Sequence, residues 1–231
     1  MQIKFSIILP CYNEYGNLKL LIPEILNIFK NKSFEILVID DNSSDQTIAK
    51  LKNHFSKNSR IKYILRRKNR SLGLSIKAGV MASKGKAVVV MDTDFNHKPI
   101  DLKKMLHLYE TNSFDMICGS RFLKGGFSST TFRHFTSLIF NYFINFIIKG
   151  KQTDNLSGFF IIKRNLISKI LNKIFYGYGD YYIRLLFYLQ RTEISIKEIP
   201  VKYGVRKYGV SKSRLARMFL LYTIETFKLL K

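Results

Sequence analysis

Cysteine is scarce in this sequence, which contains only Cys11 and Cys118. The two thiols are far apart and fit no zinc-ligand spacing, and the 4 histidines form no recognisable ligand cluster. No signal-peptide pattern is visible, so we expect both thiols to be reduced in a cytosolic protein. A zinc site is therefore not expected, and we interpret Cys11 as a packed side chain rather than a nucleophile.

Acidic residues are also few, since 16 Asp and Glu stand against 39 Lys and Arg and give a net charge of +23. Such a field attracts the phosphates of nucleic acids, anionic lipids or nucleotides. The segment 60–70, with Arg66, Arg67 and Lys68, could contact a nucleic-acid backbone. However, the sequence has no helix-turn-helix, zinc-finger or RNP-like pattern. We therefore interpret this segment as a solvated loop and expect no nucleic-acid partner.

Internal repeats, low-complexity linkers and membrane-spanning apolar runs are absent from the sequence. With 231 residues and 46% hydrophobic content, the chain can bury the core of one α/β domain. Residues 4–9, 34–39, 86–91 and 115–119 are short apolar runs typical of buried strands, and residues 47–55 have helical spacing. We expect a mostly parallel sheet.

Polar side chains follow three of these predicted strands. The carboxyl ends of parallel strands meet at one edge of a sheet, where α/β proteins bind ligands. Paired carboxylates there suit Mg²⁺ or Mn²⁺, which complete their shell with water and phosphate oxygens. Taken alone, the pair Asp92 and Asp94 also fits a turn at a strand end. The strand-end residues are Pro10, Tyr12 and Glu14, then Asp40, Asp41 and Asp45, then Asp92, Thr93 and Asp94.

Five motifs occur in the order seen in family 2 glycosyltransferases. They are Pro10-x-Tyr12-Asn13-Glu14, Asp40-Asp41 with Ser43 and Asp45, Asp92-x-Asp94, Gly119-Ser120-Arg121 and Ser157-Gly158-Phe159. The chain resembles that family, and within it the dolichyl-phosphate mannosyltransferase group, from about residue 3 to about residue 213. Residue 42 is asparagine, whereas glycine is frequent at this position in the family that the chain resembles. Asn96 stands where that group usually has glutamine, and it keeps an amide oxygen on a shorter arm.

The resemblance implies a GT-A-type nucleotide-sugar-binding domain over residues 1–213 and inverting hexose transfer to a polyprenyl phosphate. GDP-mannose is the favoured donor and UDP-glucose the second choice. Mg²⁺ or Mn²⁺ is expected at Asp92, Asp94 and Asn96. The implied catalytic residues are Asp94, Arg121 and Arg133, and the acceptor phosphate would meet Arg133 and Ser157. The implied nucleotide-sugar residues are Pro10, Tyr12, Glu14, Ile39, Asp40, Asp41, Asp45, Asp92, Thr93, Asp94, Asn96, Arg121, Arg206 and Lys212.

Individual roles follow from residue chemistry and from the resemblance. Tyr12 and Glu14 would hold base and ribose, Asp41 would accept from a base N–H, and Asp40 or Asp45 would support the loop. Guanidinium groups match phosphate oxygens in forked geometry. A phosphate monoester has a second pKa of ~6, so the acceptor is largely dianionic at neutral pH and needs no strong general base.

Two segments have amphipathic helical spacing. In the first, predicted as an embedded helix over 132–149, Ser137, Asn141 and Asn145 form a narrow polar stripe on an otherwise apolar surface. In the second, residues 214–231, basic residues and Glu225 share one arc opposite an aromatic and aliphatic arc. Such helices fit attachment to an anionic membrane surface. Packing on the sheet, on a partner chain or on a membrane-protein subunit is the alternative.

These patterns predict a peripheral enzyme on the cytoplasmic face of a membrane, and two other functions stay open. A glycosyltransferase of the same fold with a soluble or glycan acceptor would share the nucleotide motifs but would not need Arg133 beside an apolar helix. A non-enzymatic basic protein that binds nucleic acid would tolerate the loss of Asp94.

Overall fold

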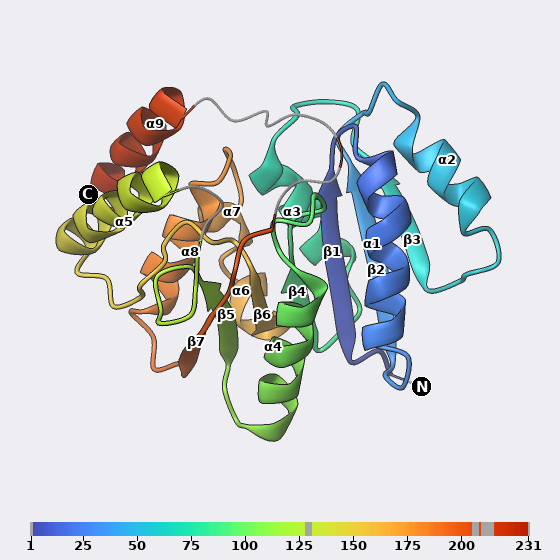
Figure 1. The fold of residues 1–231 in the computed structure, drawn as a ribbon, viewed down its shortest axis with the longest axis horizontal. Coiled ribbons are helices and arrows are strands. Elements are labelled where there is room, and N and C mark those ends of the chain that lie inside the picture. Colours follow the sequence, from blue (N-terminus) through green and yellow to red (C-terminus); the bar gives the residue numbers. More distant parts are fainter. Residues whose placement is uncertain (1, 128–130, 205–207, 209–214, 231) are drawn as a thin grey trace.

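The computed structural model describes residues 2–127, 131–204, 208 and 215–230, with only the backbone described at 131–133 and 215–217. Within these residues helices cover both faces of one central sheet (Figure 1). The strands are β1 (Phe5–Cys11), β2 (Phe34–Asp40), β3 (Ile61–Leu65), β4 (Ala87–Val90), β5 (Met116–Ser120), β6 (Phe160–Lys163) and β7 (Ile196–Pro200). The helices are α1 (Tyr15–Ile28), α2 (Thr47–His54), α3 (Leu72–Ala82), α4 (Pro99–Thr111), α5 (Thr131–Ile148), α6 (Arg164–Ser168), α7 (Leu171–Ile174), α8 (Tyr181–Leu189) and α9 (Leu215–Lys228).

The sheet has the strand order β3-β2-β1-β4-β6-β5-β7. Within it, β6 runs antiparallel to both of its neighbours, and the remaining pairs are parallel. The prediction of a mostly parallel α/β sheet is therefore confirmed. Because β6 is reversed, the segment that enters it, residues 157–159, lies at the edge where the parallel strands end. One edge thus collects the ends of β1, β2, β4 and β5 together with the start of β6.

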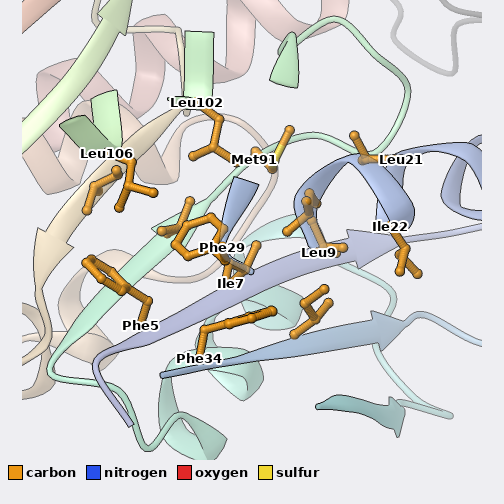
Figure 2. Close-up of a cluster of buried hydrophobic side chains, with 14 of the residues drawn as sticks. Phe5, Ile7, Leu9, Leu21, Ile22, Phe29, Phe34, Met91, Leu102 and Leu106 are labelled. Carbon is orange, nitrogen blue, oxygen red and sulfur yellow. The ribbon is translucent and has the colours of Figure 1, made fainter. Parts of the chain in front are cut away.

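Alternating side chains of β1 show how the sheet is buried on both faces. Ile7 and Leu9 enter a cluster with residues of α1 and α4, whereas Ile8 points into a second cluster with residues of α3 and α8. Figure 2 shows the first cluster, in which Phe5 meets Phe29 edge to face with ring centroids 5.5 Å apart. Each large apolar side chain fully buried in this way contributes about 1.5–3 kcal/mol relative to an exposed one. The packed layers hold the loops at the strand ends in fixed positions.

Helices α5 and α9 pack against each other and on α8 rather than on the sheet, and they lie side by side in Figure 1. A third apolar cluster joins them through Ile144 and Ile148 of α5, Ile183 and Phe187 of α8, and Tyr222 of α9. The two amphipathic segments are therefore helical, as predicted. No helix in the described part of the chain is long and apolar enough to span a bilayer.

The inward faces of these two helices are partly polar. Asn141 of α5 is buried and its Oδ1 accepts the Asn155 backbone N–H at 2.6 Å, so the predicted polar stripe faces the loop before β6. In α9 the sequence pattern places Glu225 on the arc of the basic residues, but its side chain does not face solvent. Glu225 is buried, and its carboxylate accepts from Nη1 of the fully buried Arg184 at 2.8 Å. A buried cation on α8 therefore sets the rotation of α9, which periodicity alone could not reveal.

Candidate active site

A cavity of about 580 Å³ opens at the edge where the parallel strands end. Most of the residues predicted for the nucleotide sugar lie in its wall: Pro10, Tyr12, Glu14, Asp41, Asp92, Thr93, Asp94, Asn96 and Arg121, with Ser157 beside them. The sequence did not assign several other lining residues, which are Arg70, Ser71, Leu72, Ser75, Tyr178, Gly179, Tyr181, Tyr203, Met218, Phe219 and Tyr222. The structure thus brings the strand-end motifs together in one concave site.

Asp92 and Asp94 follow β4 and face this cavity in different ways. The Asp92 side chain is 43% exposed, whereas Asp94 is buried. Both carboxylate oxygens of Asp94 receive hydrogen bonds from Asn96, from its backbone N–H at 3.1 Å and from its Nδ2 at 2.9 Å. In this arrangement Asn96 turns its amide nitrogen, and not its oxygen, toward Asp94.

The donor set at these two aspartates decides whether a divalent cation fits. In the described ranges no group of three or more His, Cys, Asp or Glu side chains could hold a metal ion. Asp92 and Asp94 supply hard oxygen ligands, and Mg²⁺ or Mn²⁺ at nucleotide sites takes its other ligands from phosphates and water. These residues therefore fit a cation that arrives with a diphosphate, and do not fit one held by protein alone.

His97, which the sequence left unassigned, is fully buried behind the Asp92 loop. Its Nδ1 accepts the Asp92 backbone N–H at 2.8 Å, and its Nε2 lies 3.1 Å from the Ser157 carbonyl oxygen and 2.9 Å from the Tyr203 hydroxyl. The ring stacks on Phe159 with centroids 4.6 Å apart. Burial lowers the pKa of His97 to about 4, so the imidazole is neutral at physiological pH.

Arg121 follows β5 and enters the cavity wall as half of a buried ion pair. Its Nε and Nη2 each donate to Asp154 at 2.8 Å, and its backbone N–H donates to the same carboxylate at 3.1 Å. Burial by itself would lower the pKa of the guanidinium, but the Asp154 carboxylate more than offsets this and raises it. Asp154 is fixed in turn, because its backbone N–H donates to Glu198 at 3.3 Å. The pair holds a permanent cation in the wall of the cavity that also contains Asp92 and Asp94.

The loop after β3 is exposed at Arg67, Lys68 and Arg70, as the sequence suggested, but not at Arg66. The side chain of Arg66 is 13% exposed and forms an ion pair with Asp41, and it also donates to the Ser75 hydroxyl at 2.8 Å. Asp41 accepts the Ser71 backbone N–H at 2.9 Å as well. The guanidinium of Arg70 lies over the Tyr12 ring at 4.1 Å from its centroid. For Arg66 the prediction was wrong, because Asp41 lies far away in the sequence from the arginine that binds it.

Asp40 and Asp45 support the neighbouring loops rather than line the cavity. Asp40 Oδ1 accepts from the backbone N–H of Ser43 at 3.0 Å, and Asp45 Oδ1 accepts from the backbone N–H of Thr47 at 2.9 Å. Burial, followed by the nearby carboxylates, raises the pKa of Asp40. Ile39 is fully buried in the second core cluster, so its side chain does not reach the cavity.

Cys11 lies in the cavity wall as a buried free thiol. Burial, and then the surrounding carboxylates, raise its pKa, which keeps it protonated and is consistent with a packed side chain. Three predicted phosphate contacts remain predictions: Arg206 and Lys212 lie outside the described residues, and for Arg133 only the backbone on α5 is described.

Helices α5 and α9 form the far wall of the cavity through Ser137, Met218, Phe219 and Tyr222. Both helices also expose large apolar side chains. These are Phe135, Ile139, Tyr142 and Phe146 on α5 and Leu220, Leu221, Ile224 and Phe227 on α9, followed by Leu230. We call this set the α5–α9 apolar face. Many exposed apolar side chains on neighbouring helices are typical of a site of interaction with a membrane or a protein.

A comparison with known families matches residues 6–171 to the family described as Glycosyl transferase family 2. The chain belongs to this family. The predicted resemblance is thereby confirmed at the level of the family, and the matched region contains every strand-end motif from β1 to β6.

The chain is also similar to individual curated proteins. The chain is 29% identical to a dolichol-phosphate mannosyltransferase of Pyrococcus furiosus over 238 residues, which covers 99% of this chain and 64% of that protein. It is 33% identical to the putative glycosyltransferase CsbB of Bacillus subtilis over 168 residues, covering 72% of this chain and 50% of that protein. A dolichyl-phosphate beta-glucosyltransferase of Dictyostelium discoideum is 25% identical over 218 residues. The chain thus spans about half to two thirds of the length of these relatives.

Solved structures agree on the fold. Glucosyl-3-phosphoglycerate synthase from Mycobacterium tuberculosis, in complex with Mn²⁺, UDP and phosphoglyceric acid, has a TM-score of 0.70 at 18% identity, covering 97% of this chain and 77% of that one. The same enzyme with Mn²⁺ and UDP-glucose gives a TM-score of 0.69 at 16% identity, with 98% and 79% coverage. At identities this low the structural similarity is evidence for the fold alone. It confirms the predicted GT-A architecture.

Some site residues carried a signal in the sequence that the motifs did not use. The segment Ile61–Leu65 is a short apolar run, and Ser71 stands directly before a helical pattern, where its hydroxyl accepts the Leu74 N–H as a helix N-cap. Recognising this strand–loop–helix would have pointed to Arg66 and Arg70 as a fourth strand-end loop. Nothing local in the sequence marks Tyr178, Tyr203 or Tyr222 as residues of the cavity.

Proposed function

We propose that this protein transfers a hexose, with mannose favoured, from a nucleotide diphosphate sugar to the phosphate of a polyprenyl phosphate. One observation carries the proposal. The same cavity has paired carboxylates on the sheet side and, on the other side, two helices whose outer surface is the α5–α9 apolar face. A charged donor and a lipid acceptor need a site of this composition.

The donor would occupy the sheet side of the cavity. Tyr12 and Arg70 offer a ring and a planar cation for the base, and Asp41, oriented by Arg66, offers carboxylate oxygens to a base N–H. Mannose is favoured because the mannosyltransferase relative aligns with 99% of this chain, whereas the glucosyltransferase relative aligns with 87%. GDP-mannose is therefore the first donor to test and UDP-glucose the second.

The chemistry requires little proton transfer. An oxygen of the acceptor phosphate attacks the anomeric carbon opposite the nucleotide, the bond from that carbon to the diphosphate oxygen breaks, and its electron pair leaves with the nucleoside diphosphate. This displacement inverts the anomeric configuration. Mg²⁺ or Mn²⁺ would supply charge neutralisation for the departing diphosphate. Asp92 and Asp94 would hold the cation in place.

Arg121 suits a phosphate contact in this reaction. Asp154 occupies its Nε and Nη2, which leaves Nη1 for a phosphate oxygen, and the ion pair fixes the orientation of the guanidinium plane. A cation held in advance needs no reorganisation when negative charge shifts during transfer, and this stabilises the transition state. Positioning and electrostatics, rather than a general base, would then account for the rate.

The α5–α9 apolar face would lie against an anionic membrane, with the cavity open to lipid phosphates. On α5 the side chain of Phe146 is 86% exposed and that of Tyr142 is 68% exposed. The net charge of +23 favours an anionic surface. Attachment would be peripheral, on the cytoplasmic face, with or without a membrane-protein subunit.

The test is transfer of radiolabelled hexose from GDP-mannose or UDP-glucose into organic-extractable polyprenyl phosphate, with Mn²⁺ or with chelator. Asp94→Asn keeps the size of the side chain and removes its charge, so label in the lipid phase should fall at least a hundredfold, as for loss of an electrostatic catalytic contact. Asp115→Asn is the matched control, because Asp115 precedes β5 at the opposite edge of the sheet, where it binds Lys163. The control should keep its activity.

Each result separates the candidate functions. Metal-dependent hydrolysis of the donor without lipid labelling would retain the nucleotide site and reject the lipid acceptor. Transfer to 3-phosphoglycerate in place of lipid would favour a soluble acceptor. Equal activity of Asp94→Asn and the wild type would remove the carboxylate pair from the mechanism.

A further inference from the structure

We infer that His97 is a positioning residue that holds the Asp92–Asp94 loop in the geometry needed for a metal–nucleotide complex. The inference rests on the proposed function, because it concerns the cation that would accompany the nucleotide. His97 itself is not among the residues that line the cavity, whereas Asp92 and Asp94 are.

Hydrogen bonds define the tautomer of this imidazole. A backbone N–H can only donate, so the 2.8 Å contact from Asp92 N requires an unprotonated Nδ1. The proton of the neutral ring is therefore on Nε2, where the Ser157 carbonyl oxygen at 3.1 Å and the Tyr203 oxygen at 2.9 Å can accept it. The Tyr203 hydroxyl in turn donates to the Ser157 carbonyl at 2.8 Å. One ring thus ties the loop after β4 to the entry of β6 and to the segment after β7.

The backbone of the loop needs such an anchor. Phe95, between Asp94 and His97, has φ = 68°, a left-handed conformation that is costly for a bulky side chain. The turn is closed from the other side by Gly204, whose N–H donates to the Asn96 carbonyl at 3.0 Å. A Cβ at Gly204 would lie 2.2 Å from the Phe95 carbonyl oxygen, so only glycine fits there. A strained turn persists when its surroundings fix it on both sides, and His97 provides the fixing bond to Asp92.

Through Tyr203, His97 is also connected to the guanidinium of Arg121. Tyr203, which shares the Nε2 proton of His97, lies under the Arg121 guanidinium with its ring centroid 4.8 Å from Cζ. The separation between the carboxylates and Arg121 therefore depends on groups that meet at one imidazole. Partners that orient metal ligands in this way typically change metal affinity by 10–100-fold when they are removed.

Two substitutions divide the contacts of His97. In His97→Asn, Oδ1 takes nearly the place of Nδ1 and can accept from Asp92, whereas the Nε2 contacts are lost. In His97→Gln, Nε2 of the amide can still donate to Ser157, but the Asp92 N–H has no acceptor. His107→Gln on α4, at an exposed histidine, is the matched control. The experiment measures the affinity of each variant for Mn²⁺ in the presence of GDP or of UDP, with free Mn²⁺ detected by its EPR signal. All titrations are carried out below the melting temperature of the least stable variant.

The expected result is at least a tenfold weaker Mn²⁺–nucleotide complex for His97→Gln, with His97→Asn closer to the wild type and His107→Gln equal to it. In addition, ¹⁵N spectra of the wild type should show the Nε2–H tautomer for the histidine signal that is missing in His97→Asn. Affinity that is unchanged in His97→Gln, or equally weak in both variants, would overturn the role assigned to the Asp92 contact.

Failure of the proposed function is distinguishable from failure of the anchor. If the wild type binds no Mn²⁺ with either nucleotide, the nucleotide assignment fails. The anchor is then judged on the apo protein alone, by the tautomer and by hydrogen exchange of the Asp92 amide. A protonated Nδ1 or an unprotected amide would overturn it, whereas the Nε2–H tautomer with a protected amide would support it.

Discussion

Replacing Asp154 with asparagine should destabilise the protein because it leaves the charge of Arg121 buried without a partner. Asp154 is 1% exposed and binds the guanidinium through two hydrogen bonds of 2.8 Å. Removing one member of such a pair costs about 3–5 kcal/mol. Because Arg121 borders a cavity that water can enter, we expect the lower limit of about 3 kcal/mol. For a chain of 231 residues this corresponds to roughly 6–12 °C in Tm.

The double variant Arg121→Met with Asp154→Leu separates stability from function. Replacing both partners of a buried ion pair by apolar groups is often neutral, so most of the lost Tm should return. Sugar transfer by the double variant should be at background, because the guanidinium proposed to contact the phosphate is removed. Circular dichroism melts at pH 7 and the lipid-labelling assay measure the two quantities. A shift in Tm below about 2 °C for Asp154→Asn, or transfer at the wild-type rate by the double variant, would refute the reasoning.

Three further predictions concern pH, packing and the surface. Burial lowers the pKa of His97 to about 4. In the unfolded chain the same imidazole binds a proton below about pH 6.5. The free energy of unfolding should therefore be highest above pH 6.5 and fall by roughly 3 kcal/mol toward pH 4. Urea midpoints across this range should slope in the wild type and less in His97→Asn, and parallel curves would contradict the assignment. Gly204→Ala, with its Cβ 2.2 Å from the Phe95 carbonyl oxygen, should cost at least about 1 kcal/mol by urea denaturation, and a neutral outcome would show that the turn can move. Phe146→Glu should weaken sedimentation with anionic vesicles roughly tenfold, whereas Met81→Glu, at a side chain 68% exposed on α3, should not; equal losses would argue against a defined membrane face.

The sequence predicted the elements that depend on local patterns. Apolar runs located β1, β2, β4 and β5 to within two residues. Glu14, Asp41, Asp92 and Asp94, which follow three of these strands, line one cavity because parallel strands end at one edge. Contacts between residues that are far apart in the chain could not be predicted from the sequence. The partner of Arg66 is 25 positions away in the chain and that of Arg184 is 41 positions away. A charged residue with a distant buried partner has the same local pattern as a solvated one. This explains the error at Arg66 and why the burial of Glu225 could not be predicted.

The same two helices form a wall of the cavity and carry the apolar face, and this limits how an acceptor could be held. Tyr222 of α9 lines the cavity and is buried, while Ile224, two residues later, is exposed on the outer face. Glu225 then locks the helix to Arg184 inside the protein. One helix, α9, therefore carries residues of both the cavity and the outer face and sets the distance between them. Under the proposed function, docking of this face would bring the phosphates of the bilayer surface to one fixed distance from Asp92 and Arg121. A lipid phosphate would then enter the site without leaving the membrane.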